Sequence, residues 1–245
     1  MPLERLQLPL PFPHQPGYAA LDFLPDQSNR NALAWLSRTA DWPDRRLALW
    51  GQGGRGKSHL LHIWAERSSG VLLAGQTLRS LDTLPETGTL ALDDADIIAD
   101  ERILLHLLNT ARDRGLSVLL SGRTPPARWP AGLPDLSSRL RAITAVEIQP
   151  PSNDLLRALL IRMVADRQLK VAEPVQEWLL LRLPRSPAVL REAVARLDRE
   201  SMARRQPITR SLAARVLDMD ELAVADADEV CPSALPISSR FARFL

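Results

Sequence analysis

The sequence predicts an α/β protein in which a parallel sheet, covered by helices on both faces, is followed by a small all-helical unit. Three observations support this fold class. Short apolar runs alternate with helical segments between residues 45 and 150, which is typical of parallel strands buried on both faces. A glycine-rich loop, GQGGRGKS, separates the first of these runs from the next helix. After residue 152, every periodic segment has the spacing of a helix.

The elements follow in order along the chain. A proline-rich leader runs to about Gly17 and must be extended, because its prolines remove amide donors and fix φ. A helix through Ala32 and Leu36 follows, with Ser28 or Asn29 as its cap. Beyond it, we expect strands at 45–51, 70–75, 87–96, 116–123 and 142–150, with helices at 57–69 and 100–115.

The second half of the chain predicts a helical bundle. Its helices are expected at 153–169, 173–183, 186–205 and 209–219. The residues from 221 onward show no clear period, which is typical of a frayed terminus. We therefore expect a leader (1–17), an α/β unit (18–151), a helical unit (152–220) and an irregular tail (221–245).

Composition excludes several classes of protein. An apolar fraction of 45% supports a true core, and a net charge of +2 makes no case for a polyelectrolyte partner beyond a local patch. The single cysteine, Cys231, rules out an intrachain disulfide and a cysteine-based zinc site. Without a secretory signal or an apolar stretch long enough for a membrane span, the expected location is the cytoplasm.

The motif GQGGRGKS fits the pattern G-x-x-x-x-G-K-[ST] and predicts a phosphate-binding loop. Glycines permit backbone angles that turn successive N–H groups around phosphate oxygens, and the following helix adds its positive amino end. Lys57 would reach the β- and γ-phosphates, and Ser58 would give its hydroxyl to Mg²⁺. We expect ADP or ATP with Mg²⁺ to be bound by Gly51, Gln52, Gly53, Gly54, Arg55, Gly56, Lys57, Ser58 and His59. The alternative is a plain glycine-rich turn between strand and helix.

Two further strand ends carry polar groups that suit this site. In TLALDDAD, Asp93 would hold Mg²⁺ and Asp94 would orient or activate an attacking water, which favours hydrolysis over storage of nucleotide. In LSVLLSGR, Ser121 would emerge beside the γ-phosphate and sense it. The alternatives are a solvated acidic strand end and a strand that simply ends in Ser-Gly.

Arg139, in DLSSRLRA, lies in a short polar stretch before the last strand. An arginine there could point away from its own nucleotide and into that of a neighbouring molecule, and a surface arginine is the alternative. The histidines show no metal-ligand spacing, and Cys231 in the irregular tail is a poor catalytic thiol.

These motifs together resemble the AAA+ ATPases, and within them the DnaA branch, over about residues 18–219. DFLPDQSNRNALAWL looks like the segment by which that branch frames the adenine, and GQGGRGKSHLLHIWA matches its P-loop and helix. GRTPPARWPAGLPDLSSRL looks like its stretch from sensor 1 to the arginine finger. The resemblance implies an AAA+ sheet followed by a helical lid, with Ser121 as sensor 1 and Arg139 as a finger acting in trans.

The leader resembles a docking peptide. QLPLPF is similar to the hexapeptides by which bacterial proteins bind the sliding clamp (β subunit) of DNA polymerase III, with Gln7 in a polar subsite and Leu8, Leu10 and Phe12 as the apolar side. Prolines stiffen such a peptide, so it loses little entropy on binding. A DnaA-like ATPase with this leader, and with no helix-turn-helix DNA-binding domain expected after the lid, resembles the Hda-type regulatory inactivators of DnaA. The resemblance implies that the chain docks on the clamp and stimulates ATP hydrolysis by DnaA, which limits replication initiation.

One position departs from the family pattern. Where the family carries a sensor 2 arginine at the start of a lid helix, this chain has Ala188. The rival interpretation is a DNA-binding initiator or loader, in which Arg204, Arg205 and Arg210 of the lid would contact DNA; a small-molecule kinase lacks an evident acceptor site. The expected partners are the clamp and DnaA, DNA indirectly through the clamp, further copies of the chain as an open alternative, and no membrane.

Overall fold

The computed structural model describes residues 23–217, so the leader with Gln7, Leu8, Leu10 and Phe12, and the tail with Cys231, lie outside the described residues. The strands are β1 (Arg46–Trp50), β2 (Val71–Ala74), β3 (Thr89–Asp93), β4 (Ser117–Gly122) and β5 (Thr144–Glu147). The helices are α1 (Arg30–Leu36), α2 (Lys57–Arg67), α3 (Glu101–Asp113), α4 (Pro134–Ala142), α5 (Asn153–Asp166), α6 (Glu173–Arg182), α7 (Pro187–Arg204) and α8 (Arg210–Val216).

The strands form one parallel sheet in the order β2-β3-β4-β1-β5. Register places Trp50, the last residue of β1, opposite Gly122, the last residue of β4. Leu92 of β3 lies opposite Leu120 of β4. The chain segments that follow β1, β3 and β4 therefore leave the sheet at one edge, which is where ligands bind in open parallel sheets.

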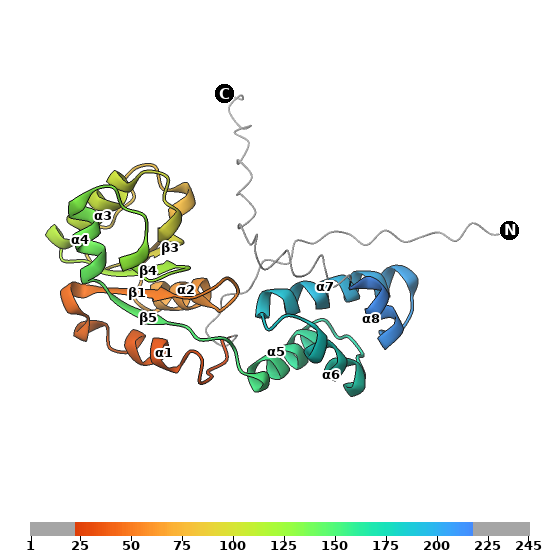
Figure 1. The fold of residues 1–245 in the computed structure, drawn as a ribbon. Helices are drawn as coiled ribbons and strands as arrows, with labels where there is room; N and C mark the ends of the chain where they lie inside the picture. Colours follow the sequence, from red (N-terminus) through yellow and green to blue (C-terminus); the bar gives the residue numbers. More distant parts are fainter. Residues whose placement is uncertain (1–22, 218–245) are drawn as a thin grey trace, which may run out of the picture.

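Helices cover both faces of the sheet, as the sequence predicts (Figure 1). On one face, the apolar residues of α3 and α4 pack on β3 and β4. On the other face, α1 and α2 pack on β1, and the rings of Trp42 and Trp64 stack at 5.2 Å between centroids. The alternation of apolar runs with helices thus corresponds to an α/β fold with both faces buried.

A separate core joins α5, α6, α7 and α8. Leu160, Leu179, Val194 and Leu212 are at most 2% exposed and belong to one apolar cluster that includes no residue of the sheet. Figure 1 shows these four helices beside the α/β part, joined to it through the segment after β5. This is the small all-helical lid that the sequence predicts.

Two local features differ from the sequence expectation. Residues 134–142, expected as a polar stretch, form α4, with Pro134 at its first position and Leu136 and Leu140 buried on one side. Helix α1 begins at Arg30 with Asn29 at its N-cap position, one of the two residues expected there, but the Asn29 side chain makes no hydrogen bond to the first turn. Asn29 instead holds the preceding turn, because its amide donates to the carbonyl of Leu24 and accepts from the N–H of Asp26.

No helix within residues 23–217 is long and apolar enough to cross a membrane. In the same range, no group of three or more His, Cys, Asp or Glu side chains is placed to hold a metal ion.

Candidate functional site

The glycine-rich loop joins β1 to α2 at the edge of the sheet where the strands end. Gly54 (φ +72°) and Gly56 (φ +89°) have left-handed backbone conformations that disfavour other residues. Gly56 also occupies the N-cap position of α2, where it offers no side chain to the first-turn amides. The amino end of this 11-residue helix therefore suits an anion.

Lys57 is buried inside this loop, at 7% exposure. Its ammonium donates to the carbonyl oxygens of Gly51 and Gln52, at 2.7 and 3.0 Å. Burial lowers the pKa of Lys57, and the nearby carboxylates, of which Asp94 contributes most, act in the opposite direction. A buried ammonium that donates to carbonyl oxygens of its own loop is placed to exchange them for phosphate oxygens.

Arg55 supports the loop rather than opening toward solvent. Its Nη1 donates to the carbonyl of Ile148 at 2.9 Å and lies 3.6 Å from a carboxylate oxygen of Glu147, at the end of β5. Its Nη2 donates to the side-chain oxygen of Gln52 at 3.2 Å. The side chain of Arg55, which the sequence predicts as a nucleotide-binding residue, is therefore held by β5 and by the loop itself.

Ser58 and His59 lie in the first turn of α2. The ring of His59 lies edge-on to that of Phe23, with centroids 5.3 Å apart. The carbonyl oxygen of Ser58 is 2.8 Å from Nδ1 of His62, one turn further along α2. Phe23 thus borders the loop, and its ring also lies 3.3 Å from where a Cβ on Gly56 would stand.

Asp93, Asp94 and Ser121 meet at the ends of β3 and β4. Ser121 is fully buried, and its hydroxyl donates to Asp93 Oδ1 and accepts from the N–H of Asp94 at 2.9 Å. Burial raises the pKa of Asp94, as do the charges of Asp93 and Asp96, while Lys57 opposes the shift. The structure therefore brings together the acid pair and the strand-end serine that the sequence singles out, within the electrostatic reach of Lys57.

Arg139 lies toward the other end of the sheet. Its Nε donates to Asp135, one turn earlier in α4, at 3.2 Å. Its charge acts on Arg46, whose pKa is lowered first by burial and then by Arg139. Arg46 begins β1, whereas the glycine-rich loop follows the end of β1, roughly 16 Å away at ~3.3 Å per strand residue.

The start of α7 packs on the glycine-rich loop. A Cβ added to Gly54 would lie 3.0 Å from the Cβ of Ala188, which stands where the resemblance to the DnaA branch leads us to expect a sensor 2 arginine. Arg185, just before α7, is turned toward the linker and donates to the carbonyl of Pro151 at 3.2 Å. At residue 188, then, the lid presents a methyl group to the loop.

Sequence reasoning missed Asp26, which ties the two parts of the chain together. Its carboxylate accepts from the hydroxyl of Ser28 at 2.6 Å and from that of Ser152, the N-cap of α5, at 2.7 Å. Burial raises the pKa of Asp26, but these hydrogen bonds outweigh it and hold the pKa well below its usual range. The only local signal is the D-x-S spacing of Asp26 and Ser28, which is typical of a turn. This spacing does not indicate that Asp26 also binds Ser152, which is far away in the sequence.

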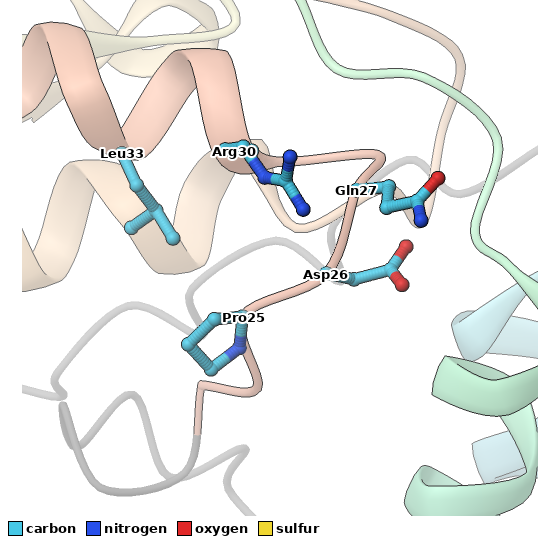
Figure 2. Close-up of a pocket in the computed structure, with 5 residues that line it drawn as sticks. All are labelled: Pro25, Asp26, Gln27, Arg30 and Leu33. Atoms are coloured by element: carbon cyan, nitrogen blue, oxygen red, sulfur yellow. The ribbon is translucent and has the colours of Figure 1, made fainter.

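Asp26 also lines a surface pocket of about 320 Å³ beside α1. Figure 2 shows Arg30 and Leu33 projecting from α1, while Asp26 and Gln27 extend from the turn before it. The pocket lies in the segment 22–36, which the resemblance to the DnaA branch leads us to expect as an adenine-framing element.

No family model matches the sequence. Among solved structures, domain III of the replication initiation protein DnaA from Thermotoga maritima is similar, with a TM-score of 0.68 and 18% identity over 84% of this chain and 98% of that one. A replication initiator DnaA bound to AMPPCP and single-stranded DNA matches with a TM-score of 0.58 and 17% identity over 74% of this chain and 64% of that one. The Thermotoga maritima RuvB Holliday junction branch migration motor matches with a TM-score of 0.62 and 18% identity over 82% and 72%. These similarities confirm the predicted AAA+ fold.

Proposed function

We propose that this AAA+ chain binds adenine nucleotide at residues 51–59 and, docked on the sliding clamp of DNA polymerase III, stimulates ATP hydrolysis by DnaA. The observation that carries the proposal is that the phosphate-type loop and Arg139 lie toward opposite ends of the strands of one sheet. The phosphate-type loop, with Lys57 and the acid pair, lies at the carboxyl end of β1. Arg139 lies toward the amino end of β1, where another molecule's nucleotide could meet it.

Nucleotide binding is supported by the loop geometry and by the structural neighbours. The left-handed glycines, the amino end of α2 with glycine at its N-cap, and the buried Lys57 suit a phosphate chain. Two of the similar DnaA structures are bound to AMPPCP. Lys57 would hold phosphate oxygens, and Ser121 would keep Asp93 and Asp94 in place beside them.

A Mg²⁺ ion fits the same residues. No cluster of three or more acidic or histidine side chains in residues 23–217 could hold the metal alone. Mg²⁺ typically uses one or two carboxylates together with nucleotide phosphates, so that Ser58 and Asp93 would be sufficient protein partners. When bound, the metal would neutralise phosphate charge, and Asp94 would hold a water.

The nucleotide site is tested by Lys57→Ala. A ligand that binds only the folded state raises the melting temperature, and this rise should disappear with the ammonium. The measurement is thermal unfolding with and without saturating Mg·ADP or Mg·ATP. Lys170→Ala is the matched control, because Lys170 is the other lysine of the chain and is exposed. An unchanged shift in Lys57→Ala would exclude phosphate binding at this loop.

Clamp docking is tested through the leader, which lies outside the described residues. Replacing Gln7, Leu10 and Phe12 together by alanine should abolish capture by the DNA-loaded clamp, since these side chains would fill its subsites. The same variant should keep its nucleotide-dependent melting shift, because its folded core is intact. Equal clamp binding by the variant and the wild type would remove this part of the proposal.

The second candidate is a DNA-binding initiator or loader, which the DnaA and RuvB neighbours favour by fold. Two of the lid arginines proposed to contact DNA have partners within the chain: Arg204 pairs with Glu200, and the guanidinium of Arg210 lies 5.9 Å from the centroid of the Trp178 ring. Salt-dependent binding of duplex or single-stranded DNA by the isolated protein would favour this candidate.

A further inference from the structure

We propose that residues 218–229, the acidic segment that follows α8, fold back onto an apolar and basic surface of the lid and cover it. We call this surface the Trp178 platform, which consists of Trp178, Leu181 and Arg182 of α6 and Arg210 of α8. The segment lies outside the described residues, whereas the platform lies within them. A segment held there would shield two arginines of the lid from other anions.

The apolar part of the platform is open to solvent. Leu181 is 86% exposed, whereas Leu179 on the same helix is 1% exposed and belongs to the core of the lid. Trp178, Leu181 and Arg182 are three or four residues apart, so they share one side of α6. Trp178 is half-buried, because it also packs against that core. The platform can therefore bury further apolar surface against a partner.

The charged part of the platform has two guanidinium groups at one ring. The guanidinium carbon of Arg182 lies 4.9 Å from the centroid of the Trp178 ring, and that of Arg210 lies 5.9 Å from it. Within residues 23–217 neither group pairs with a carboxylate, whereas Arg204 of the same lid pairs with Glu200. Two like charges at one ring repel each other, and a carboxylate near both would relieve this repulsion. The platform therefore suits a partner that is acidic and carries an apolar side chain.

The segment after α8 has this chemistry. Residues 152–217 contain thirteen Lys and Arg and seven Asp and Glu, a net charge of +6. Residues 218–229 contain six Asp and Glu and no Lys or Arg, a net charge of −6. Leu222 and Val224 lie between the acidic residues of this segment. Charge and apolar character thus complement the platform in the part of the chain that directly follows it.

The length of chain favours this occupant over a separate molecule. Leu217 is 2% exposed, so the segment starts from a residue fixed in the core of the lid. The helical rise of about 1.5 Å per residue places Arg210 about 10 Å from Leu217 along α8. An extended chain covers about 3.3 Å per residue, so Asp220 and Glu221 are within reach of Arg210. A tether this short gives an effective concentration of about millimolar, against which DNA or a second copy would have to compete.

Disulfide cross-linking in the full chain tests the contact. In a Cys231→Ser background, Leu181→Cys and Leu222→Cys together place one thiol on the platform and one in the segment. A disulfide requires Cβ atoms within about 4.5 Å, and under mild oxidation we expect it to form within one molecule, as mass spectrometry of non-reduced peptides would show. The reduced chain should melt at the wild-type temperature, because Leu181 is exposed. Ile161→Cys in place of Leu181→Cys is the matched control. Ile161 is an exposed apolar residue of α5 outside the platform, and its cross-link should form about tenfold more slowly.

The charges provide a second comparison in the same chain. Arg182→Gln with Arg210→Gln should slow the cross-link between the cysteines at 181 and 222 by about threefold or more, because two ion pairs are lost. Added salt should slow it in the same direction.

The outcomes separate the possible occupants. An intramolecular cross-link that prefers position 181 to position 161 and slows without the two arginines supports the proposal. Equal rates at the two positions, or an unchanged rate without the arginines, overturn it. A disulfide-linked dimer in place of the intramolecular product also overturns it and assigns the platform to a second copy of the chain. Equal rates together with binding of labelled single-stranded DNA that requires Arg182 and Arg210 would assign the platform to nucleic acid instead.

Discussion

At the scale of single residues, Asp94 combines a left-handed backbone with a carboxylate that the fold disfavours as an anion. Its φ is +50°, and burial together with Asp93 and Asp96 raises its pKa. We expect Asp94→Asn to stabilise the nucleotide-free protein at neutral pH, because it removes a half-buried negative charge while asparagine also tolerates this backbone conformation. Each kcal/mol gained should raise the melting temperature by roughly 2–4 °C in a chain of this size.

The pH dependence of that difference provides the control. Since the pKa of Asp94 is higher in the folded than in the unfolded state, the folded protein binds more protons, and stability from this residue increases as the pH falls. The wild type should therefore approach Asp94→Asn in melting temperature as the pH is lowered through the raised pKa. A variant advantage that stays constant from pH 7 to pH 4 would contradict this account.

The site residues differ in how far the sequence could predict them. Gly56, Lys57 and Asp93 are set by local pattern, because a strand end followed by a fixed spacing places each of them at the same edge of a parallel sheet. Asp26 has no such pattern. Its importance comes from Ser152, a partner in the other part of the chain, and a contact of that range follows from the packing of the lid.

At the scale of elements, the linker between β5 and α5 is held to the turn before α1 by Asp26. Asp26→Ala should lower the free energy of unfolding by about 1–3 kcal/mol, because the N–H and hydroxyl groups of Ser28 and Ser152 would lose a charged acceptor. Urea denaturation at pH 7 measures this, with the exposed loop residue Asp82→Ala as control. Because the pKa of Asp26 is lower in the folded than in the unfolded state, its contribution to stability is present above the unfolded-state pKa. This contribution is lost as the pH falls toward the folded-state pKa of Asp26. If both variants unfold at the same urea concentration, Asp26 does not brace the linker.

The elements themselves were predicted unevenly, for physical reasons. The buried strands have continuous apolar runs, such as Leu47–Leu49 in β1, which few other structures allow. Helix α4 was missed because prolines and serines dominate its surroundings, although the buried pair Leu136 and Leu140 has helical spacing. Its nine residues owe their helical state to packing on the core beside α3 rather than to propensity.

At the scale of the whole molecule, the direction of the parallel strands separates the two parts of the proposed function, nucleotide binding and the action of Arg139. Parallel strands place everything that follows their carboxyl ends at one edge, and Arg139 belongs to the helix that precedes β5 and therefore lies near the strands' amino ends. A single chain with this topology cannot easily bring Arg139 to its own loop. It can present Arg139 to a second molecule, since the side chain is 23% exposed and its nearest acid, Asp135, is itself at the surface.

Arg139→Ala distinguishes a regulator from a self-contained enzyme. An arginine placed in trans stabilises charge that develops on the transferred phosphoryl group, and its loss typically costs about 10³–10⁵ in rate. The variant should bind Mg·ADP and the loaded clamp as the wild type does, because Arg139 is remote from residues 51–59 and the substitution leaves the leader's sequence unchanged, yet it should fail to stimulate hydrolysis. The assay follows labelled ATP already bound to DnaA, with loaded clamp and either form of the protein. Arg141→Ala is the matched control, an exposed arginine two residues along the same helix. If Arg139→Ala stimulates hydrolysis as well as the wild type does and Arg141→Ala does not, the trans role belongs to Arg141. If Arg139→Ala instead lowers this protein's own ATPase rate, Arg139 acts on the nucleotide of its own chain.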